Sequence, residues 1–258
     1  MSTWSGRRVG RRWLLTQTGR GAVGIAVLGI AACSSSDGSS SSTAGDRAEP
    51  SEPQSPESGT PDSAGGMEWS RVNLGFVSAY VLVRGNEAAV VDTGVGGSAD
   101  AIGKVLDQAG PGWGGVRHVV LTHKHPDHAG SISDVLAEAT SATGYIGQAD
   151  LSEVDAQLSV LGDGDEVFGL QILATPGHTA GHVSVFDEDT GVLVAGDSLT
   201  NDGGLAGSSP DFTEDEAAAV ASVRKMAGLA PATILVGHGD PVVDGAAAAL
   251  EELASSLG

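Results

Sequence analysis

The sequence predicts an α/β layered fold, because segments typical of strands and segments typical of helices interleave in two similar halves. Strand-like runs rich in Val, Ile and Leu recur between residues 77 and 236, and segments with helical spacing of apolar residues lie between them. Several polar clusters begin where an apolar run ends, which places them at the ends of strands. These observations predict one folded domain over residues 67–258, long enough to bury a core.

A β-hairpin is expected at the start of the first half. Its two strands are rich in β-forming residues, and the segment between them, Arg84 to Glu87, places Gly85 and Asn86 at the turn. The elements expected in this half are strands over 77–83, 88–91, 116–121 and 144–146 and helices over 99–108 and 127–139.

The second half is expected to repeat this mixture of strands and helices. Its strands are predicted over 166–174 (one or two strands), 183–186, 192–195 and 233–236, and its helices over 213–228 and 245–257. Thr213 is the expected N-cap of the first of these helices, because Glu216 follows three residues later and completes a capping box.

The first 66 residues differ in composition from the rest of the chain. The five Arg of residues 1–33 are not accompanied by any Asp or Glu, and residues 21–32 form an apolar run about half as long as a membrane span. Residues 34–66 are rich in Ser, Gly, Pro and acids, and such a segment cannot bury enough apolar surface to fold. We therefore expect a signal peptide over 1–33 and a disordered linker over 34–66, before the folded domain.

Two short motifs in the first segment predict export. Arg11-Arg12-Trp13-Leu14-Leu15 resembles a twin-arginine signal, and Ile30-Ala31-Ala32-Cys33 resembles a lipobox, whose Cys becomes the lipidated N-terminus. The expected location is the outer face of the cytoplasmic membrane, with the lipid on Cys33 as the only membrane contact. The alternative is a cytoplasmic protein with a disordered tail and a chance Cys.

Charge and cysteine content exclude several classes of function. The chain after residue 33 contains 8 Lys and Arg and all 33 Asp and Glu, so this part has a formal charge of −25. Nucleic-acid binding is disfavoured, because phosphate contacts need clustered basic residues. Cys33 is the only cysteine, so a metal site in the folded domain must consist of His and carboxylates.

The strongest local motif is His123-Lys124-His125-Pro126-Asp127-His128, which follows directly after the predicted strand 116–121. In an extended segment His123 and His125 project to the same side, as two ligands of one ion must. A turn at Pro126 lets Asp127 and His128 face a second ion close by. The alternative is a solvated polar loop, although several uncoordinated His at one strand end are difficult to satisfy.

Three further candidate ligands occupy similar positions after predicted strands. They are His178 in Thr175-Pro176-Gly177-His178-Thr179, Asp197 in Gly196-Asp197-Ser198, and His238 in Gly237-His238-Gly239. If these strand ends converge, five His and two Asp form a site large enough for two metal ions, with Asp197 between them.

The order H-x-H-x-D-H, P-G-H-T, G-D and G-H-G, preceded by Val90-Val91-Asp92-Thr93-Gly94, resembles the metallo-β-lactamase superfamily from about Val72 to the C-terminus. The resemblance implies an αββα four-layer sandwich with two metals at one edge of the sheets, and makes residues 67–258 the catalytic domain. It further implies that His123, His125 and His178 hold the first metal, that Asp127, His128 and His238 hold the second, and that Asp197 bridges them.

Departures from individual branches narrow the resemblance. The β-lactamase subclasses with a Cys ligand are disfavoured because the domain has no Cys, and the remaining subclass lacks a bridging Asp. Gly196-Asp197 is similar to the branch of glyoxalase II and acyl-homoserine-lactone lactonases. Only about 20 residues follow His238, so we expect no glutathione-binding domain, and a glutathione thioester is a poor candidate substrate.

The resemblance implies hydrolysis of a small ester-like substrate, with a lactone preferred. Two divalent ions would generate hydroxide near neutral pH, and Asp127 would shuttle the proton. Zinc is the expected metal for a His-rich N/O site, and manganese or iron would also fit. Two alternatives remain open: a mononuclear iron enzyme similar to persulfide dioxygenases, and a tethered binding module without catalysis.

Several other residues receive separate expectations. Asp92 is expected to orient a ligand from outside the ligand set. His182 is expected to be a hydrogen-bonded structural residue, His118 a surface or core residue, and Lys124 a solvated loop lysine. No motif assigns Tyr145 to the site. The Gly-rich segment 203–210 is expected to border the substrate pocket, where specificity is set.

Overall fold

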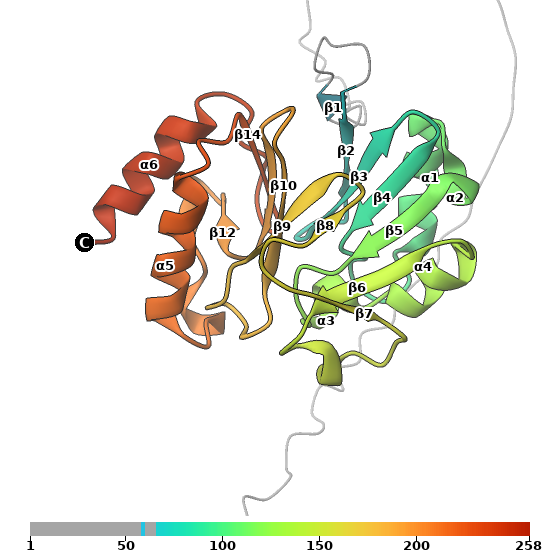
Figure 1. Cartoon of the computed structure of the whole chain (residues 1–258), viewed down its shortest axis with the longest axis horizontal. Coiled ribbons are helices and arrows are strands. Elements are labelled where there is room, and N and C mark those ends of the chain that lie inside the picture. Colours follow the sequence, from blue (N-terminus) through green and yellow to red (C-terminus); the bar gives the residue numbers. More distant parts are fainter. Residues whose placement is uncertain (1–57, 60–65) are drawn as a thin grey trace, which may run out of the picture. The chain divides into compact units, whose positions relative to one another are not determined.

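A computed structural model describes residues 58–59 and 66–258. Two β-sheets lie face to face, and helices cover the outer face of each sheet (Figure 1). This αββα arrangement confirms the predicted fold class. The expected signal peptide and most of the expected linker lie outside the described residues, although Ser58–Gly59 within the linker forms strand β1, paired antiparallel with β2 (Glu68–Asn73).

The first sheet has seven strands in the order β1-β2-β3-β4-β5-β6-β7. After β1 and β2 these are β3 (Ser78–Arg84), β4 (Glu87–Val91), β5 (Val116–Val120), β6 (Thr143–Gly147) and β7 (Ser159–Leu161). Pairing is antiparallel from β1 to β4 and parallel from β4 to β7. Arg84 pairs with Glu87, which confirms the two-residue turn expected at Gly85-Asn86.

Four helices belong to this half: α1 (Ala99–Ala109), α2 (Gly112–Gly115), α3 (Pro126–Ala129) and α4 (Ile132–Glu138). The prediction of a single helix over 127–139 is wrong, because the helix is interrupted between α3 and α4. Gly130 donates its backbone N–H to Gly94 O at 2.9 Å, and the Ser131 hydroxyl donates to Val95 O at 2.6 Å. These contacts with the loop after β4 replace the helical hydrogen bonds there.

The second sheet has five strands in the order β14-β11-β10-β9-β8. They are β8 (Glu166–Val167), β9 (Leu170–Ala174), β10 (Val183–Asp187), β11 (Val192–Gly196) and β14 (Thr233–Val236). Only the β11–β14 pair is parallel. Helices α5 (Glu216–Ala227) and α6 (Ala246–Ser256) cover its outer face.

The segment after β11 forms a small ribbon of its own. Strands β12 (Leu199–Thr200) and β13 (Ala206–Gly207) pair antiparallel, and a 3-10 turn over Pro210–Phe212 leads to α5. A similar turn over Leu151–Glu153 follows β6.

The N-cap expected at Thr213 is wrong, because α5 begins two residues later. Asp215 is the N-cap, and its side chain accepts a hydrogen bond from Ala218 N at 3.0 Å. The Thr213 hydroxyl instead donates to Ser209 O at 2.7 Å and lies 2.7 Å from the Ser208 hydroxyl. Thr213 therefore shapes the segment before the helix.

Strand β3 shows how the two apolar layers form. Its alternate residues point to opposite faces, as strand geometry requires. Tyr80 and Leu82 pack between the sheets, while Val81 and Val83 pack under the first group of helices. Because both faces are covered, the strand reads as a continuous apolar run, and burial of each large aliphatic side chain contributes about 1.5–3 kcal/mol.

Strands β2 and β7 had no predicted counterpart. In the β2 sequence EWSRVN the two apolar residues, Trp69 and Val72, are separated by Ser70 and Arg71, so no apolar run marks it. Strand β7 has three residues, of which only Leu161 is buried. Both strands owe their position to pairing with a longer strand.

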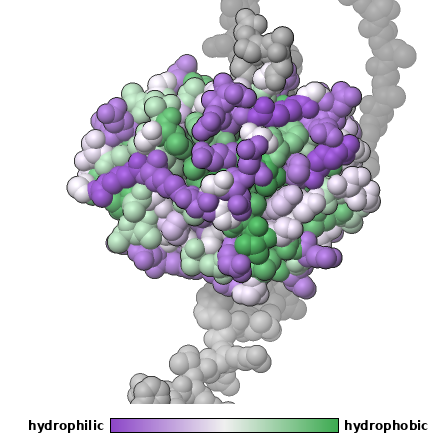
Figure 2. Space-filling model, in the orientation of Figure 1, coloured by the Kyte–Doolittle hydropathy of each residue, from purple (hydrophilic) through white to green (hydrophobic). Residues whose placement is uncertain are grey.

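The surface carries both polar and apolar side chains. The face of the molecule drawn in Figure 2 is largely hydrophilic, with smaller hydrophobic areas between the polar ones. Within the described ranges, no helix combines the length and hydrophobicity needed to cross a membrane.

Replacing the observed cap tests the corrected start of α5. We expect Asp215→Ala to lower the free energy of unfolding by about 1 kcal/mol, because one backbone N–H of the first turn loses its acceptor. Chemical denaturation measures this difference. Asp211→Ala, which removes an exposed carboxylate before the helix, is the control and should change stability by less than about 0.5 kcal/mol.

Candidate metal centre

The seven residues predicted as ligands come together at one edge of the two sheets. His123, His125, Asp127 and His128 follow β5, and the last two lie on α3. His178 follows β9, Asp197 follows β11, and His238 follows β14. The strands end side by side at this edge, so residues more than a hundred positions apart share one site.

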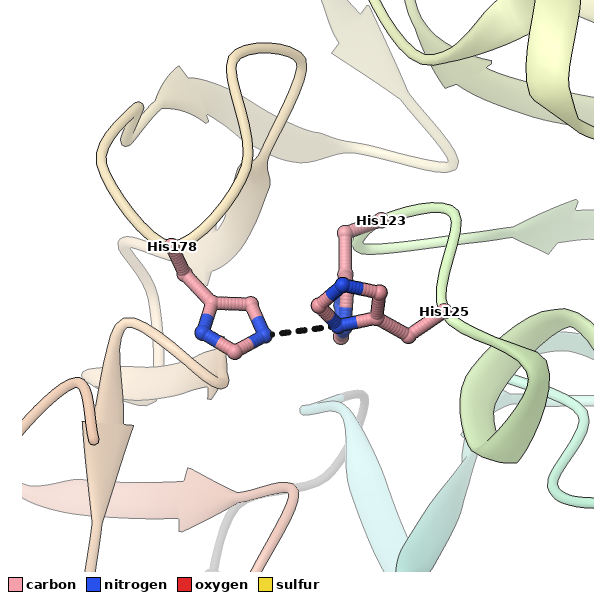
Figure 3. Close-up of side chains that lie close together, drawn as sticks. All are labelled: His123, His125 and His178. Atoms are coloured by element: carbon pink, nitrogen blue, oxygen red, sulfur yellow. Dashed lines mark hydrogen bonds between the residues drawn. The ribbon is translucent and has the colours of Figure 1, made fainter. Parts of the chain in front are cut away.

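The first group of candidate ligands consists of three imidazoles. His123 Nε2 lies 3.0 Å from His125 Nδ1, and His178 Nε2 lies 2.9 Å from the same atom. Figure 3 shows the three rings turned toward one another, His123 and His125 from one loop and His178 from the facing loop. Their ligand atoms all lie within 4.8 Å of each other, as binding of one ion requires.

The second group combines a carboxylate with two imidazoles. His238 Nε2 lies 3.3 Å from Asp127 Oδ2 and 3.5 Å from His128 Nε2. Asp127 Oδ2 lies 3.9 Å from His128 Nε2. His128 is fully buried, whereas Asp127 and His238 are partly exposed to the cavity beside the site.

Asp197 lies between the two groups. Its Oδ1 is 3.2 Å from His128 Nε2, and its Oδ2 is 3.4 Å from His178 Nε2 and 3.2 Å from His238 Nε2. One carboxylate therefore faces a member of each group.

The donor set fits divalent cations. Three ring nitrogens converge in the first group, but a neutral imidazole has only one N–H to donate, so the three cannot satisfy one another. Asp197 Oδ1 is buried and lacks a well-aligned hydrogen bond. In addition, the spacing of 2.9–3.0 Å between nitrogens is close to the edge of about 3.3 Å that a tetrahedral site with Zn–N bonds of about 2.0–2.1 Å would have.

Four of the five histidines are also held through their other ring nitrogen, an arrangement typical of metal ligands. The partners are Thr122 Oγ1 for His123 (3.0 Å), Asp92 Oδ2 for His128 (2.8 Å), Ser208 Oγ for His178 (2.9 Å) and Phe76 O for His238 (2.7 Å). These contacts fix the orientation of each of the four rings, so that its other nitrogen faces the site.

Asp92 contacts one of the candidate ligands, His128. It follows β4 with a left-handed φ of 63°, and its carboxylate is buried. The carboxylate accepts from Thr122 N at 2.8 Å and contacts His128 Nδ1 at 2.8 Å. Strain at this residue is thus compensated by contacts to the loop after β5.

The two groups differ in protonation when no metal is bound. Burial lowers the pKa of His178 to about 4 and holds the pKa of His123 well below its ordinary value, so both rings are neutral at pH 7. Hydrogen bonds with Asp127 and then Asp197 raise the pKa of His238 to about 10. Burial opposes a charge on His128, but Asp197 and Asp92 hold its pKa well above the ordinary value. Protons therefore occupy the second group until a cation displaces them.

The comparison with known families agrees with this geometry. The model of the metallo-beta-lactamase superfamily matches residues 72–160 and 149–238. The chain belongs to the metallo-beta-lactamase superfamily. The matched ranges contain every candidate ligand named above, and the superfamily relatives are mostly hydrolases.

Curated relatives include two Bacillus subtilis (strain 168) proteins. YobT is 29% identical over 196 residues, which cover 63% of this chain and 83% of YobT. YflN, a probable metallo-hydrolase, is 30% identical over 202 residues, covering 59% of this chain and 75% of YflN. A hydroxyacylglutathione hydrolase of Erwinia tasmaniensis is 42% identical over 89 residues, about a third of each chain.

Solved structures share the fold. A metallo-beta-lactamase family protein from Thermus thermophilus superposes with a TM-score of 0.59 at 24% identity, covering 74% of this chain and 79% of that chain. At this identity the likeness supports the αββα architecture.

Asp150 is a buried residue beside the superfamily motifs. Sequence analysis did not predict its role. Its carboxylate accepts from Lys124 N at 3.1 Å, Thr179 Oγ1 at 2.6 Å and Gly181 N at 2.8 Å. It therefore joins the loop of His123 and His125 to the loop of His178. Its partners are 26 to 31 residues away, so no local pattern marks it.

The hairpin of β2 and β3 holds the loop of His238. Arg71 donates to Gly239 O at 2.7 Å and to Asp240 Oδ1 at 2.9 Å. Ser78 N donates to Gly237 O at 2.9 Å, and Tyr80 Oη donates to Val236 O at 2.8 Å. The sequence did not predict that this hairpin holds the loop of His238, because β2 itself was not predicted.

Lys124 differs from its expectation as a solvated lysine. Its amine pairs with Glu153 and Glu214, the latter at 2.9 Å, and its side chain is only 14% exposed. These hydrogen bonds raise its pKa above the ordinary value. Lys124 thus links the two halves beside the site, and its charge is already compensated.

The remaining histidines have the structural roles expected for them. His182 is buried, with Nδ1 2.8 Å from Thr175 Oγ1 and Nε2 3.2 Å from Asp197 N, and burial lowers its pKa to about 3. It therefore supports the loop of Asp197. His118 is half-buried on β5, where its ring packs against Tyr145 and Phe168.

A cavity of about 620 Å³ opens onto the candidate ligands. One wall contains His125, Asp127, His178, Asp197 and His238, and the other is the segment from Thr200 to Phe212. Ala206, Gly207, Ser209 and Pro210 of the Gly-rich segment line it, as expected for a segment bordering a pocket.

Gly237 tests the close packing at the shared carboxylate. A methyl group here would lie 2.1 Å from Asp197 Oδ1 and 2.6 Å from His128 Cε1. We expect Gly237→Ala to displace these side chains and to reduce the bound divalent metal per chain to less than half of the value for the unmodified protein, by elemental analysis. Gly114→Ala, which adds its methyl group to open space, is the control and should retain full metal content.

The protonation difference gives a second test. In chelator-treated protein, we expect His238 to keep its proton up to about pH 10 and His178 to stay neutral down to about pH 4, measured by NMR titration. Because the pKa values of His238 and His128 are both raised, bound protons compete with the cation. Affinity at the second group should therefore rise with pH up to about pH 10, by at least about tenfold per unit. An affinity unchanged between about pH 7 and 9 would contradict this assignment.

Proposed function

We propose that this protein is a metal-dependent hydrolase that holds two divalent cations and cleaves an ester-like bond, with a lactone or other small ester as substrate. The position of Asp197 supports this most directly, because its carboxylate lies within 3.4 Å of a ring nitrogen of both His178 and His238. A carboxylate shared in this way suits a pair of cations better than a single one.

In this proposal His123, His125 and His178 would hold the first cation, Asp127, His128 and His238 would hold the second, and Asp197 would be shared between them. Zinc is the preferred metal because the set is rich in imidazole, and manganese or iron would also suit it. Two bound cations would supply an activated water near neutral pH and polarise the substrate carbonyl.

The chain's own groups supply orientation and proton transfer. Asp127 is an acid with a lowered pKa, caused chiefly by its hydrogen bond with His238, so it is a carboxylate at neutral pH. It lines the cavity, where it is placed to accept a proton from the attacking water and return it to the leaving oxygen. Asp92, Ser208 and the Phe76 carbonyl keep the imidazoles in position.

The relatives support hydrolysis as the reaction class. YflN is a probable metallo-hydrolase, and the Erwinia tasmaniensis relative is a hydroxyacylglutathione hydrolase. The alternative is oxygen-dependent chemistry on persulfides at a single iron. A single ion held by the first three His would leave Asp127, His128 and His238 without a function, so the second group favours the hydrolase.

Assays under two conditions distinguish these reactions. We expect zinc- or manganese-loaded protein to cleave lactones and aryl esters without oxygen, and chelators to abolish the activity. Asp127→Asn should lower kcat by about 10²–10⁴-fold, because the variant loses both a ligand of the second cation and the proton-transfer group. Asp134→Asn, an exposed carboxylate on α4, is the control. Oxygen uptake with glutathione persulfide by iron-loaded protein, without cleavage of any ester, would favour the dioxygenase.

We also propose export with a lipid anchor on Cys33, supported by the twin-arginine-like and lipobox-like motifs. Cys33→Ser should abolish lipid labelling and release the protein from the membrane fraction. Labelling with a radioactive or alkynyl fatty acid measures this. Unmodified protein that starts at Met1 and stays in the cytoplasm of its native host would refute the proposal.

A further inference from the structure

The walls of the cavity beside the candidate metal centre differ in character. The ligand wall is polar. The opposite wall, formed by the segment from Thr200 to Phe212, combines Ala206, Gly207, Pro210 and Phe212 with three polar residues, Thr200, Asp202 and Ser209. A cavity of about 620 Å³ is large enough for a small acyl compound.

No Lys or Arg is among the residues that line this cavity in the described part of the chain. The two basic side chains beside the ligand loops already have partners. Lys124 pairs with Glu153 and Glu214, and Arg71 binds Asp240 and Gly239 O. A substrate carboxylate would therefore find no basic side chain to pair with in the cavity.

The acidic groups also offset the positive charge that cations would bring. Asp127 and Asp197 belong to the ligand set, Asp92 contacts His128, and Asp202 lines the cavity. These four carboxylates balance the charge of two divalent ions, so little net attraction for an anion remains.

Two aromatic side chains are exposed at this site. Phe212 lines the cavity and is 68% exposed, and Phe76 is 64% exposed with its ring stacked on His238 at a centroid distance of 6.1 Å. Large exposed aromatic rings beside a cavity are typical of a surface that contacts an apolar ligand.

We propose, on the basis of the hydrolase function above, that the site takes uncharged esters or lactones with an apolar acyl group. Phe212 contacts the acyl group, and Asp202 repels substrates whose acyl group carries a carboxylate. Both are specificity-determining residues. Esters and thioesters with free carboxylates, including those of glutathione, are then poor substrates.

A matched pair of substrates tests the charge preference. The 4-nitrophenyl ester of octanoic acid and the 4-nitrophenyl monoester of octanedioic acid have the same chain length and differ by one carboxylate. We expect the zinc-loaded full chain to show a kcat/KM at least about tenfold higher for the uncharged ester, with a difference that shrinks at high salt.

Variants assign the preference to the two residues. Asp202→Asn should raise kcat/KM for the charged ester about threefold or more and leave the uncharged ester less affected. Asp211→Asn, outside the cavity, should not change the ratio. Phe212→Ala should lower the preference for the octanoyl over the acetyl ester by about fivefold or more, whereas Val243→Ala, an exposed residue elsewhere, should retain it.

The outcomes separate this inference from the proposed function. Cleavage of both esters at equal rates, or faster cleavage of the charged one, would overturn the inference and leave the hydrolase intact. Unchanged ratios in both Asp202→Asn and Phe212→Ala would overturn the assignment of these residues. If no ester is cleaved with any metal, the proposed function itself fails.

Discussion

The buried carboxylate of Asp197 is the constraint on which the site depends. It is almost fully buried, yet its two oxygens face imidazoles that come from three different loops. A buried carboxylate is stable only beside positive charge or hydrogen-bond donors, so the loops of His128, His178 and His238 must all close on it. Gly237 lets the last of these loops approach closely enough, because no side chain stands between it and the carboxylate.

Contacts between the two halves of the fold keep these loops in place. Arg71 of β2 holds the loop of His238, Asp150 holds the loop of His178, and Lys124 pairs with an acid on each side. None of these residues belongs to the ligand set. They fix the distance between the sheet edges, and the ligand geometry follows from that distance.

The sequence predicted what is encoded locally. The candidate ligands lie in short motifs directly after apolar strands, and the hairpin turn at Gly85-Asn86 depends on two residues. By contrast, β2 has no apolar run, and the roles of Asp150 and Arg71 depend on partners from 26 to 169 residues away. The cap of α5 was misplaced because the Thr213 hydroxyl bonds to the preceding segment at Ser209. The break at Gly130 was not predicted because it depends on a contact with Gly94, 36 residues earlier in the chain.

The ligand groups are divided between the sheets. His123, His125 and His128 come from the first sheet, and His178 and His238 come from the second. A cation bound to either group would therefore be a reversible cross-link between the two sheets. Loss of the cation would weaken the packing between the two sheets before either sheet unfolds. The interior between the sheets would then be the first part open to proteases. The lifetime of this protein would then depend on the metal supply of its surroundings.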